Sequence, residues 1–215
     1  MAETSEDWLR RWVDGNTPFH QEAVNEQLVR HWPAVVEDAN AAVLVPLCGK
    51  SLDMLWLRDR GHKVVGLELS AIAAADFFAE NGMECTSESR GPFTVFAADG
   101  IEIWAGDFFE ATAELLGPLT AWYDRAAIVA LPPSMRTQYA QQVSALLGPK
   151  AAGFMLTFDY PAEEREGPPH SVSFADAQRA FSDAFDVTEL DCLDLTEGNR
   201  WELSRVWKPV IGLRR

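Results

Sequence analysis

The sequence predicts an α/β protein built on a doubly wound, mostly parallel sheet. Strand-like apolar runs alternate with helical periodicity after about residue 40, the pattern of parallel strands joined by crossover helices. A length of 215 residues favours one domain. Hydrophobic residues make up 47% of the chain and charged residues 24%, a composition that buries a core and argues against disorder. We therefore expect a single domain over 1–215, with a core at 41–215 preceded by a helical extension at 1–40.

Two helices are expected in the extension. The first covers 6–13, where Trp8 and Trp12 share one helical face with apolar neighbours. The second covers 21–32 and is expected to end at Pro33, because proline lacks the N–H that a helix interior needs and restricts the residue before it.

The core elements follow from apolar runs and capping residues. A continuous run such as AAVLVPL is typical of a strand buried on both faces, and the pair Asp99-Gly100 between two runs predicts a hairpin. Ser173 with Asp176 matches a capping box at a helix start. The expected strands cover 41–47, 62–69, 93–97, 101–105, 119–123, 152–158, 187–193 and 203–210. The expected helices cover 51–60, 70–81, 134–147 and 173–184.

The charge of the chain excludes several classes of partner. Lysine and arginine total 18 against 33 aspartate and glutamate, so the formal net charge is −15. A protein that holds DNA or RNA by phosphate neutralisation needs a surplus of basic residues, and an anionic membrane surface repels an acidic chain. We expect neither a nucleic-acid partner nor a membrane partner.

The cysteines and the N-terminus indicate a cytoplasmic protein. Cys48, Cys85 and Cys192 are odd in number and far apart, and no CxxC pair occurs, which disfavours a disulfide framework or a structural zinc site. The acidic N-terminus lacks the apolar run of a signal peptide, and no stretch approaches the ~20 apolar residues of a membrane helix. Neither HExxH nor GxSxG is present, so we expect no metal.

Ligands of such a sheet bind beyond the carboxyl ends of its strands. The first strand is followed by PLCGKS, in which Gly49-Lys50-Ser51 resembles the end of a P-loop. A P-loop needs a glycine five positions before Gly49, and that position is Leu44, so the motif is rejected. Gly49 is interpreted as a tight strand-to-helix turn, which also lets the backbone of a ligand pass close by.

Three positions, Gly49, Glu68 and Asp107, together suit an adenosine ligand. Glu68 ends the second strand about 20 residues after the Gly49 turn, where a carboxylate accepts both ribose hydroxyls. Asp107 and Phe108 follow the hairpin and are placed at the base. A solvated Glu68 is the alternative for the first position, and a helix N-cap is the alternative for Asp107, which can serve both roles.

Arg125 ends the strand at 119–123 as part of the pair Asp124-Arg125. An arginine at the end of a buried strand is costly to desolvate without an anion. Two interpretations stay open: a structural pair with Asp124 or with a glutamate, or a guanidinium that faces a ligand.

Several segments resemble the thiopurine S-methyltransferases: WLRRWV (8–13), FHQE (19–22), VPLCGKSLDMLWLRDRGHKVVGLELS (45–70), YDRAAIVALPP (123–133) and EGPPHSV (166–172). The resemblance spans nearly the whole chain. It implies a Rossmann-like class I methyltransferase fold of seven strands with the last antiparallel, and S-adenosyl-L-methionine as cofactor. By position it implies cofactor contacts from Trp12, Leu47, Gly49, Glu68, Asp107, Phe108 and Arg125.

The resemblance also implies an acceptor and its contacts. Phe19 and His170 would contact a small aromatic or heterocyclic thiol such as a thiopurine, with selenium or tellurium species as further acceptors. Trp12 and Phe19 would cover the bound cofactor as a lid, and Arg125, the candidate catalytic residue, would steady either the acceptor anion or the cofactor carboxylate. We expect a monomer. The alternatives are a methyltransferase for halides or small aliphatic thiols and a non-catalytic adenosine-binding domain.

Overall fold

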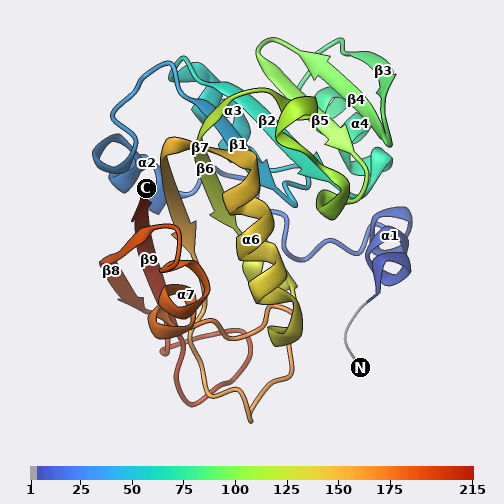
Figure 1. The fold of residues 1–215 in the computed structure, drawn as a ribbon. Helices are drawn as coiled ribbons and strands as arrows, with labels where there is room; N and C mark the ends of the chain where they lie inside the picture. Colours follow the sequence, from blue (N-terminus) through green and yellow to red (C-terminus); the bar gives the residue numbers. More distant parts are fainter. Residues whose placement is uncertain (1–3) are drawn as a thin grey trace.

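The computed structural model describes residues 4–215, which form one nine-stranded sheet with helices on both faces (Figure 1). The strand order across the sheet is β3-β4-β5-β2-β1-β6-β7-β9-β8. The strands are β1 (Ala42–Pro46), β2 (Lys63–Glu68), β3 (Thr86–Arg90), β4 (Phe93–Ala98), β5 (Ile101–Ala105), β6 (Leu119–Arg125), β7 (Leu147–Leu156), β8 (Asp186–Asp194) and β9 (Trp207–Arg214).

The centre of the sheet is parallel and both margins are antiparallel. Strands β5, β2, β1, β6 and β7 run in one direction, as the apolar runs predict. On one side β9 pairs antiparallel with β7 and β8 pairs with β9, while on the other side β4 pairs antiparallel with β5 and β3 with β4. The α/β, doubly wound fold class is thus confirmed.

The strand number is the point at which the expected fold is wrong. The resemblance implies seven strands, and the structure has nine because β3 and β4 extend the β5 edge. The apolar pattern finds β4 but misses β3, whose five residues are all exposed and polar. A solvent-exposed edge strand has no buried face and so leaves no alternation in the sequence.

The helices divide between the two faces of the sheet. Those on one face are α2 (Glu26–Val35), α3 (Asp53–Asp59) and α4 (Ala71–Glu80), which share a buried cluster with Val43 and Val45. Those on the other face are α5 (Ala113–Leu116), α6 (Arg136–Leu146) and α7 (Phe174–Phe181), which share a second cluster with Leu44. Alternate residues of β1 therefore serve opposite clusters, as a strand between two helical layers requires. Helix α1 (Ser5–Val13) contributes to neither cluster.

Helix α2 differs from its predicted limits at both ends. It begins at Glu26, where the side chain of Asn25 accepts from the N–H of Gln27, and it continues through Pro33 to Val35. Proline removes one backbone hydrogen bond. The side chains of Trp32 and Val35 on either side of it are buried, and their packing keeps this segment helical.

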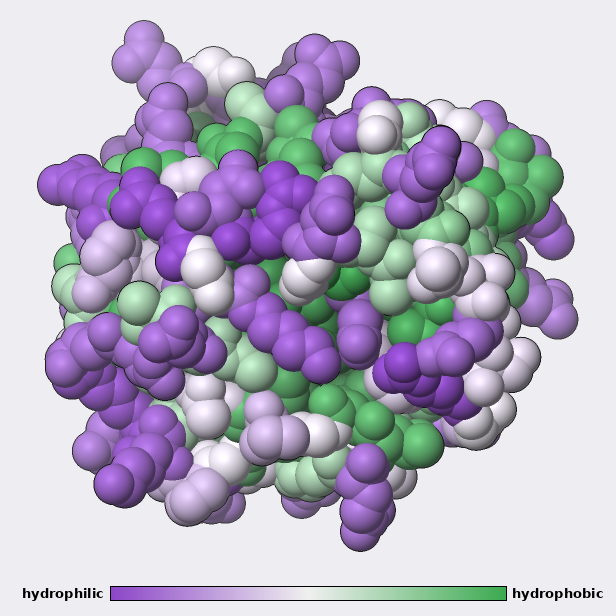
Figure 2. Space-filling view, turned by 90° about the horizontal axis from the view of Figure 1, so that it is seen from above, coloured by the Kyte–Doolittle hydropathy of each residue, from purple (hydrophilic) through white to green (hydrophobic). Residues whose placement is uncertain are grey.

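Hydrophilic side chains cover much of the face seen in Figure 2, with smaller hydrophobic patches between them. This distribution agrees with a chain whose net charge is −15 and whose apolar residues fill two clusters around the sheet. Within residues 4–215, no helix is both long enough and apolar enough to cross a membrane.

A buried histidine joins α2 to the start of β2. The indole N–H of Trp32 donates to Nε2 of His62 at 3.0 Å, and Nδ1 of His62 lies 3.2 Å from the carbonyl oxygen of Ala41. Nε2 must be unprotonated to accept from the indole, so the ring is neutral with its proton on Nδ1. Burial lowers the pKa of His62 below its usual 6.5.

We predict that the contribution of His62 to stability is lost as the pH falls below about 6.5, because the unfolded state then binds a proton that folded His62 rejects. The measurement is urea unfolding between about pH 8 and pH 5 for the wild type and His62→Gln, whose amide keeps both hydrogen bonds without titrating. The variant should show a shallower loss of unfolding free energy. His31→Gln, in α2 next to Trp32, is the control, and equal pH dependence in wild type and His62→Gln would contradict the prediction.

Candidate functional site

A cavity of about 1010 Å³ opens at the carboxyl-terminal edge of the parallel strands. The loops that follow β7 and β8 project from this same edge (Figure 1). All but one of the predicted site residues line the cavity: Trp12, Phe19, Leu47, Gly49, Glu68, Asp107, Phe108 and Arg125. They come from four strand ends and from the N-terminal segment, so the tertiary structure brings them together.

The turn after β1 has a strained backbone. Leu47 has φ +48° and Gly49 has φ +52°, both in the left-handed region that costs a side-chain-bearing residue energy. A Cβ at Gly49 would lie 3.2 Å from the indole of Trp12. Glycine therefore avoids both the backbone strain of the turn and the tight contact with Trp12.

The carboxylate of Glu68 fixes this turn from the end of β2. Its Oε2 accepts from the N–H of Gly49 at 2.9 Å, and its Oε1 accepts from the N–H of Ser70 at 2.9 Å. The side chain is buried, and burial raises the pKa of Glu68 while the backbone donors act in the opposite direction. Each carboxylate oxygen keeps a second lone pair, so Glu68 can still accept hydrogen bonds from a ligand in the cavity.

Asp107 and Phe108 belong to a short helix, η1 (Phe108–Glu110), that follows β5. The N-cap alternative for Asp107 is correct, since its carboxylate accepts from the N–H of Phe109 at 2.9 Å. Phe108 is buried against the ring of Tyr139, with centroids 5.3 Å apart. Gln142 of α6 was not predicted, yet its side-chain amide donates to the carbonyl oxygens of Phe108 at 3.0 Å and Ala111 at 2.8 Å and so positions η1.

Arg125 pairs with Asp53, and neither of the structural partners expected from the sequence is correct. Its Nε donates to Asp53 Oδ2 at 2.8 Å, and its Nη2 donates to Ser51 Oγ at 3.0 Å. Asp124 instead accepts from the hydroxyl of Tyr139 at 2.6 Å and from two backbone N–H groups. Burial raises the pKa of Asp124 to about 6.

Asp53 is the centre of a buried network. Besides Arg125, it accepts from the hydroxyl of Tyr123 at 2.9 Å and from the N–H of Asn25 at 2.7 Å. Its side chain is 1% exposed and that of Arg125 13%, so both charges are desolvated. The Nη1 edge of Arg125 makes no bond to any residue from 4 to 215 and is available to an anion in the cavity.

The aromatic part of the wall comes from the N-terminal segment. The ring of Phe19 lies edge-on to Trp12 at 5.5 Å and edge-on to Trp8 at 5.7 Å. The carbonyl oxygen of Pro18 accepts from Arg200 at 3.3 Å, which joins this segment to the loop between β8 and β9. These residues precede the core in sequence yet form one side of its cavity.

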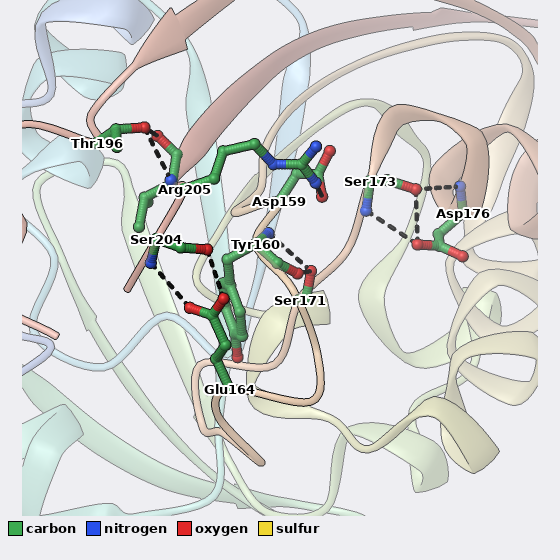
Figure 3. A network of polar contacts seen from close by, with 10 residues as sticks. Asp159, Tyr160, Glu164, Ser171, Ser173, Asp176, Thr196, Ser204 and Arg205 are labelled. Atoms are coloured by element: carbon green, nitrogen blue, oxygen red, sulfur yellow. Dashed lines mark hydrogen bonds and ion pairs between the residues drawn. The ribbon is translucent and has the colours of Figure 1, made fainter. Parts of the chain in front are cut away.

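Two long loops, one after β7 and one after β8, also line the cavity and are bound to each other (Figure 3). Ser171 Oγ accepts from the N–H of Tyr160 at 3.0 Å and donates to its carbonyl oxygen at 2.7 Å. Glu164 accepts from both the N–H and the hydroxyl of Ser204, and Arg205 pairs with Asp159 at 3.3 Å. The segment after β7 and the segment after β8 therefore hold each other in place.

His170 is the predicted residue that does not line the cavity. Its N–H donates to the carbonyl oxygen of Val129 at 2.6 Å, and its ring packs against Gly167. The neighbouring Pro168 and Pro169 line the cavity instead.

The sheet order and a cavity at the carboxyl edge of the parallel strands define the class I methyltransferase fold. A family model described as Thiopurine S-methyltransferase (TPMT) matches residues 3–211. The chain belongs to the thiopurine S-methyltransferase family.

Curated relatives of similar length carry the family name. A thiopurine S-methyltransferase of Pseudomonas fluorescens (strain Pf0-1) is 44% identical over 92% of this chain and 90% of its own length. One from Pseudomonas syringae pv. pisi is 45% identical over 97% of both chains.

Solved structures share the fold at low identity. A Burkholderia thailandensis 1,6-didemethyltoxoflavin-N1-methyltransferase, solved with S-adenosylhomocysteine, has TM-score 0.64 and 16% identity, and the match covers 98% of this chain and 86% of that one. The cyclase SpnF has TM-score 0.69 and 11% identity, with 100% and 97% covered. Since a cyclase and an N-methyltransferase share this architecture, the fold alone does not specify the reaction.

We predict that the Arg125 and Asp53 side chains are strongly coupled. Asp53→Asn and Arg125→Met should each lower the free energy of unfolding by about 3 kcal/mol, because each leaves a buried charge without its partner. The double variant should cost less than the sum of the two. Urea denaturation measures all four proteins, with Asp59→Asn on the exposed end of α3 as the control. Additive effects would show that the pair is not coupled.

Proposed function

We propose that this protein is a methyltransferase that uses S-adenosyl-L-methionine to methylate thiol groups of small aromatic or heterocyclic compounds such as thiopurines. The observation that carries the proposal is that one cavity of about 1010 Å³ contains both a set of residues suited to adenosine and an aromatic wall with cationic side chains. A cofactor and a flat acceptor need such adjoining regions. Membership of the family supports the same activity.

The residues present fit the cofactor. Glu68 would accept the ribose hydroxyls with the lone pairs that Gly49 and Ser70 leave free. The Gly49 turn provides a surface without a side chain for the amino acid portion, and Arg125 offers its Nη1 edge to a carboxylate. The full set proposed to hold the cofactor is Trp12, Leu47, Gly49, Glu68, Asp107, Phe108 and Arg125.

Alignment is the main contribution of this chain to the reaction. When bound, S-adenosyl-L-methionine supplies a methyl group on a positively charged sulfur. Trp12 and Phe19, 5.5 Å apart, present aromatic rings to the cavity, and such rings attract a cation by about 0.5–2 kcal/mol. Positioning of the two reactants then lowers the barrier, as it does when a bimolecular step is made effectively unimolecular.

The acceptor thiol needs no strong general base to lose its proton. Aromatic and heterocyclic thiols are acidic enough to be largely thiolate near neutral pH, so no strong general base is required. Arg125, the proposed catalytic residue, holds negative charge at the end of β6, either the thiolate or the cofactor carboxylate. Phe19 and His170 are the proposed acceptor contacts, and of these Phe19 lines the cavity.

The cavity favours a ring-shaped acceptor over a halide or a small aliphatic thiol. Phe158 and Trp201 both line it and lie edge-on to each other at 5.1 Å, an arrangement that suits a flat aromatic molecule. Selenium and tellurium species are proposed as further acceptors. We also propose that residues 1–40 are a helical lid on a 41–215 core within one domain, and that the protein acts as a cytoplasmic monomer on small molecules.

The proposed activity predicts methyl transfer by the purified protein. Incubation with S-adenosyl-L-methionine and 6-mercaptopurine should yield the S-methyl product, detected by mass spectrometry, and a screen over thiols, selenite and tellurite should rank the acceptors. A non-catalytic adenosine-binding domain would bind the cofactor but form no methylated product. Cofactor binding with no turnover of any acceptor would overturn the proposal.

Glu68→Ala is predicted to weaken S-adenosyl-L-methionine binding by at least about 1.5 kcal/mol, because the ribose hydroxyls and the Gly49 N–H both lose a charged acceptor. Isothermal titration calorimetry measures the affinity. Glu110→Ala, an exposed residue of η1, is the matched control and should bind normally. An unchanged affinity for Glu68→Ala would remove Glu68 from the cofactor site.

A further inference from the structure

Lys208 is a cation in the cavity wall that the sequence motifs do not include. It is the second residue of β9, partly buried, and it lines both the main cavity and an adjoining one of about 600 Å³. Its Nζ lies 5.8 Å from the centre of the Phe158 ring. Lys208 therefore faces the part of the cavity assigned to the acceptor.

The ammonium group of Lys208 has no anionic partner within residues 4–215. No carboxylate lies within the 4.0 Å of an ion pair, although Asp194 and Glu197 line the same cavity. No hydrogen bond compensates it either. Burial lowers the pKa of Lys208, and the nearby positive charge of Arg125 lowers it further. A partly buried cation in this state is stabilised by any anion that enters.

The local charges leave one positive charge uncompensated. Arg125 and Lys208 are both close to Asp53, but Asp53 bonds directly to Arg125 at 2.8 Å. The chain as a whole carries a net charge of −15, so an unpaired cation at its cavity contrasts with its surroundings. The excess positive charge of Arg125 and Lys208 over Asp53 equals the charge of one anionic group on a bound molecule.

We propose that Lys208 forms an anion subsite that binds a carboxylate on the ring of the acceptor, so that the preferred acceptors are aromatic thiols bearing an acidic substituent. This inference rests on the proposed methyltransferase function. The acceptor ring packs against Phe158, and its carboxylate reaches the ammonium group beside that ring.

The carboxylate of the cofactor is the other source of such an anion, and the geometry favours the acceptor. Arg125 already offers its Nη1 edge beside Ser51 and the Gly49 turn, where the cofactor is proposed to lie. Lys208 instead adjoins Phe158 and the loop after β8. Arg125 is thus placed to hold an anion beside the Gly49 turn, and Lys208 is placed to hold one beside Phe158.

The test compares 4-mercaptobenzoate with thiophenol, which differ by the carboxylate. The ratio of kcat/KM for the acid over thiophenol should exceed one in the wild type and fall at least tenfold in Lys208→Met, as loss of a charge-assisted hydrogen bond of about 1.5–3 kcal/mol implies. Lys208→Arg should restore most of the ratio. Lys150→Met, an exposed lysine of β7, is the control, and circular dichroism checks that each variant folds.

A binding measurement completes the test without turnover. Calorimetry should show that 4-(methylthio)benzoate binds the wild type with S-adenosylhomocysteine at least tenfold more tightly than it binds Lys208→Met. An equal ratio of the two thiols in wild type and Lys208→Met would overturn the subsite, as would a tenfold loss of S-adenosylhomocysteine affinity in that variant, which would place the cation at the cofactor. Absence of methylation of both thiols by the wild type would overturn the proposed function itself.

Discussion

The buried carboxylate of Asp53 is the interaction on which the cavity depends. It joins the start of α3, the end of β6 and the N-cap of α2 through Arg125, Tyr123 and Asn25. A desolvated carboxylate is stable only when its lone pairs are filled, and these donors fill them. The same carboxylate therefore holds both the guanidinium of Arg125 and the residue at which α2 begins.

The charged side chains of Glu68, Arg125 and Lys208 differ in how far other protein groups neutralise or hydrogen-bond them. Glu68 accepts from backbone N–H groups, Arg125 donates to Asp53 and Ser51, and Lys208 lies over the ring of Phe158 without an ion pair to residues 4 to 215. Compensation that is complete within the protein rigidifies a site, whereas incomplete compensation leaves affinity for a ligand. Glu68 keeps one lone pair on each oxygen, Arg125 keeps its Nη1, and Lys208 keeps its ammonium group for a bound molecule, so all three can contact a ligand in the cavity.

Much of the aromatic and cationic lining of the cavity comes from segments outside the parallel strands. The sheet is shared with an N-methyltransferase and with a cyclase at identities of 16% and 11%. The N-terminal segment and the loops after β7 and β8 supply the aromatic and cationic side chains, and they are joined by Arg200 to Pro18 and by Glu164 to Ser204. The same fold therefore accommodates different reactions.

The sequence by itself determined the alternation of strands and helices, the turn at Gly49 and the positions of Glu68 and Asp107, because periodicity, capping and strand ends are local properties. It did not determine the exposed strand β3, which has no apolar face, or the passage of α2 through Pro33, which depends on the burial of Trp32. The partner of Arg125 lies 72 positions away, and Lys208 lies further still along the chain. Only the tertiary structure selects such contacts, since pairing between distant charges depends on which strand ends meet at one edge of the sheet.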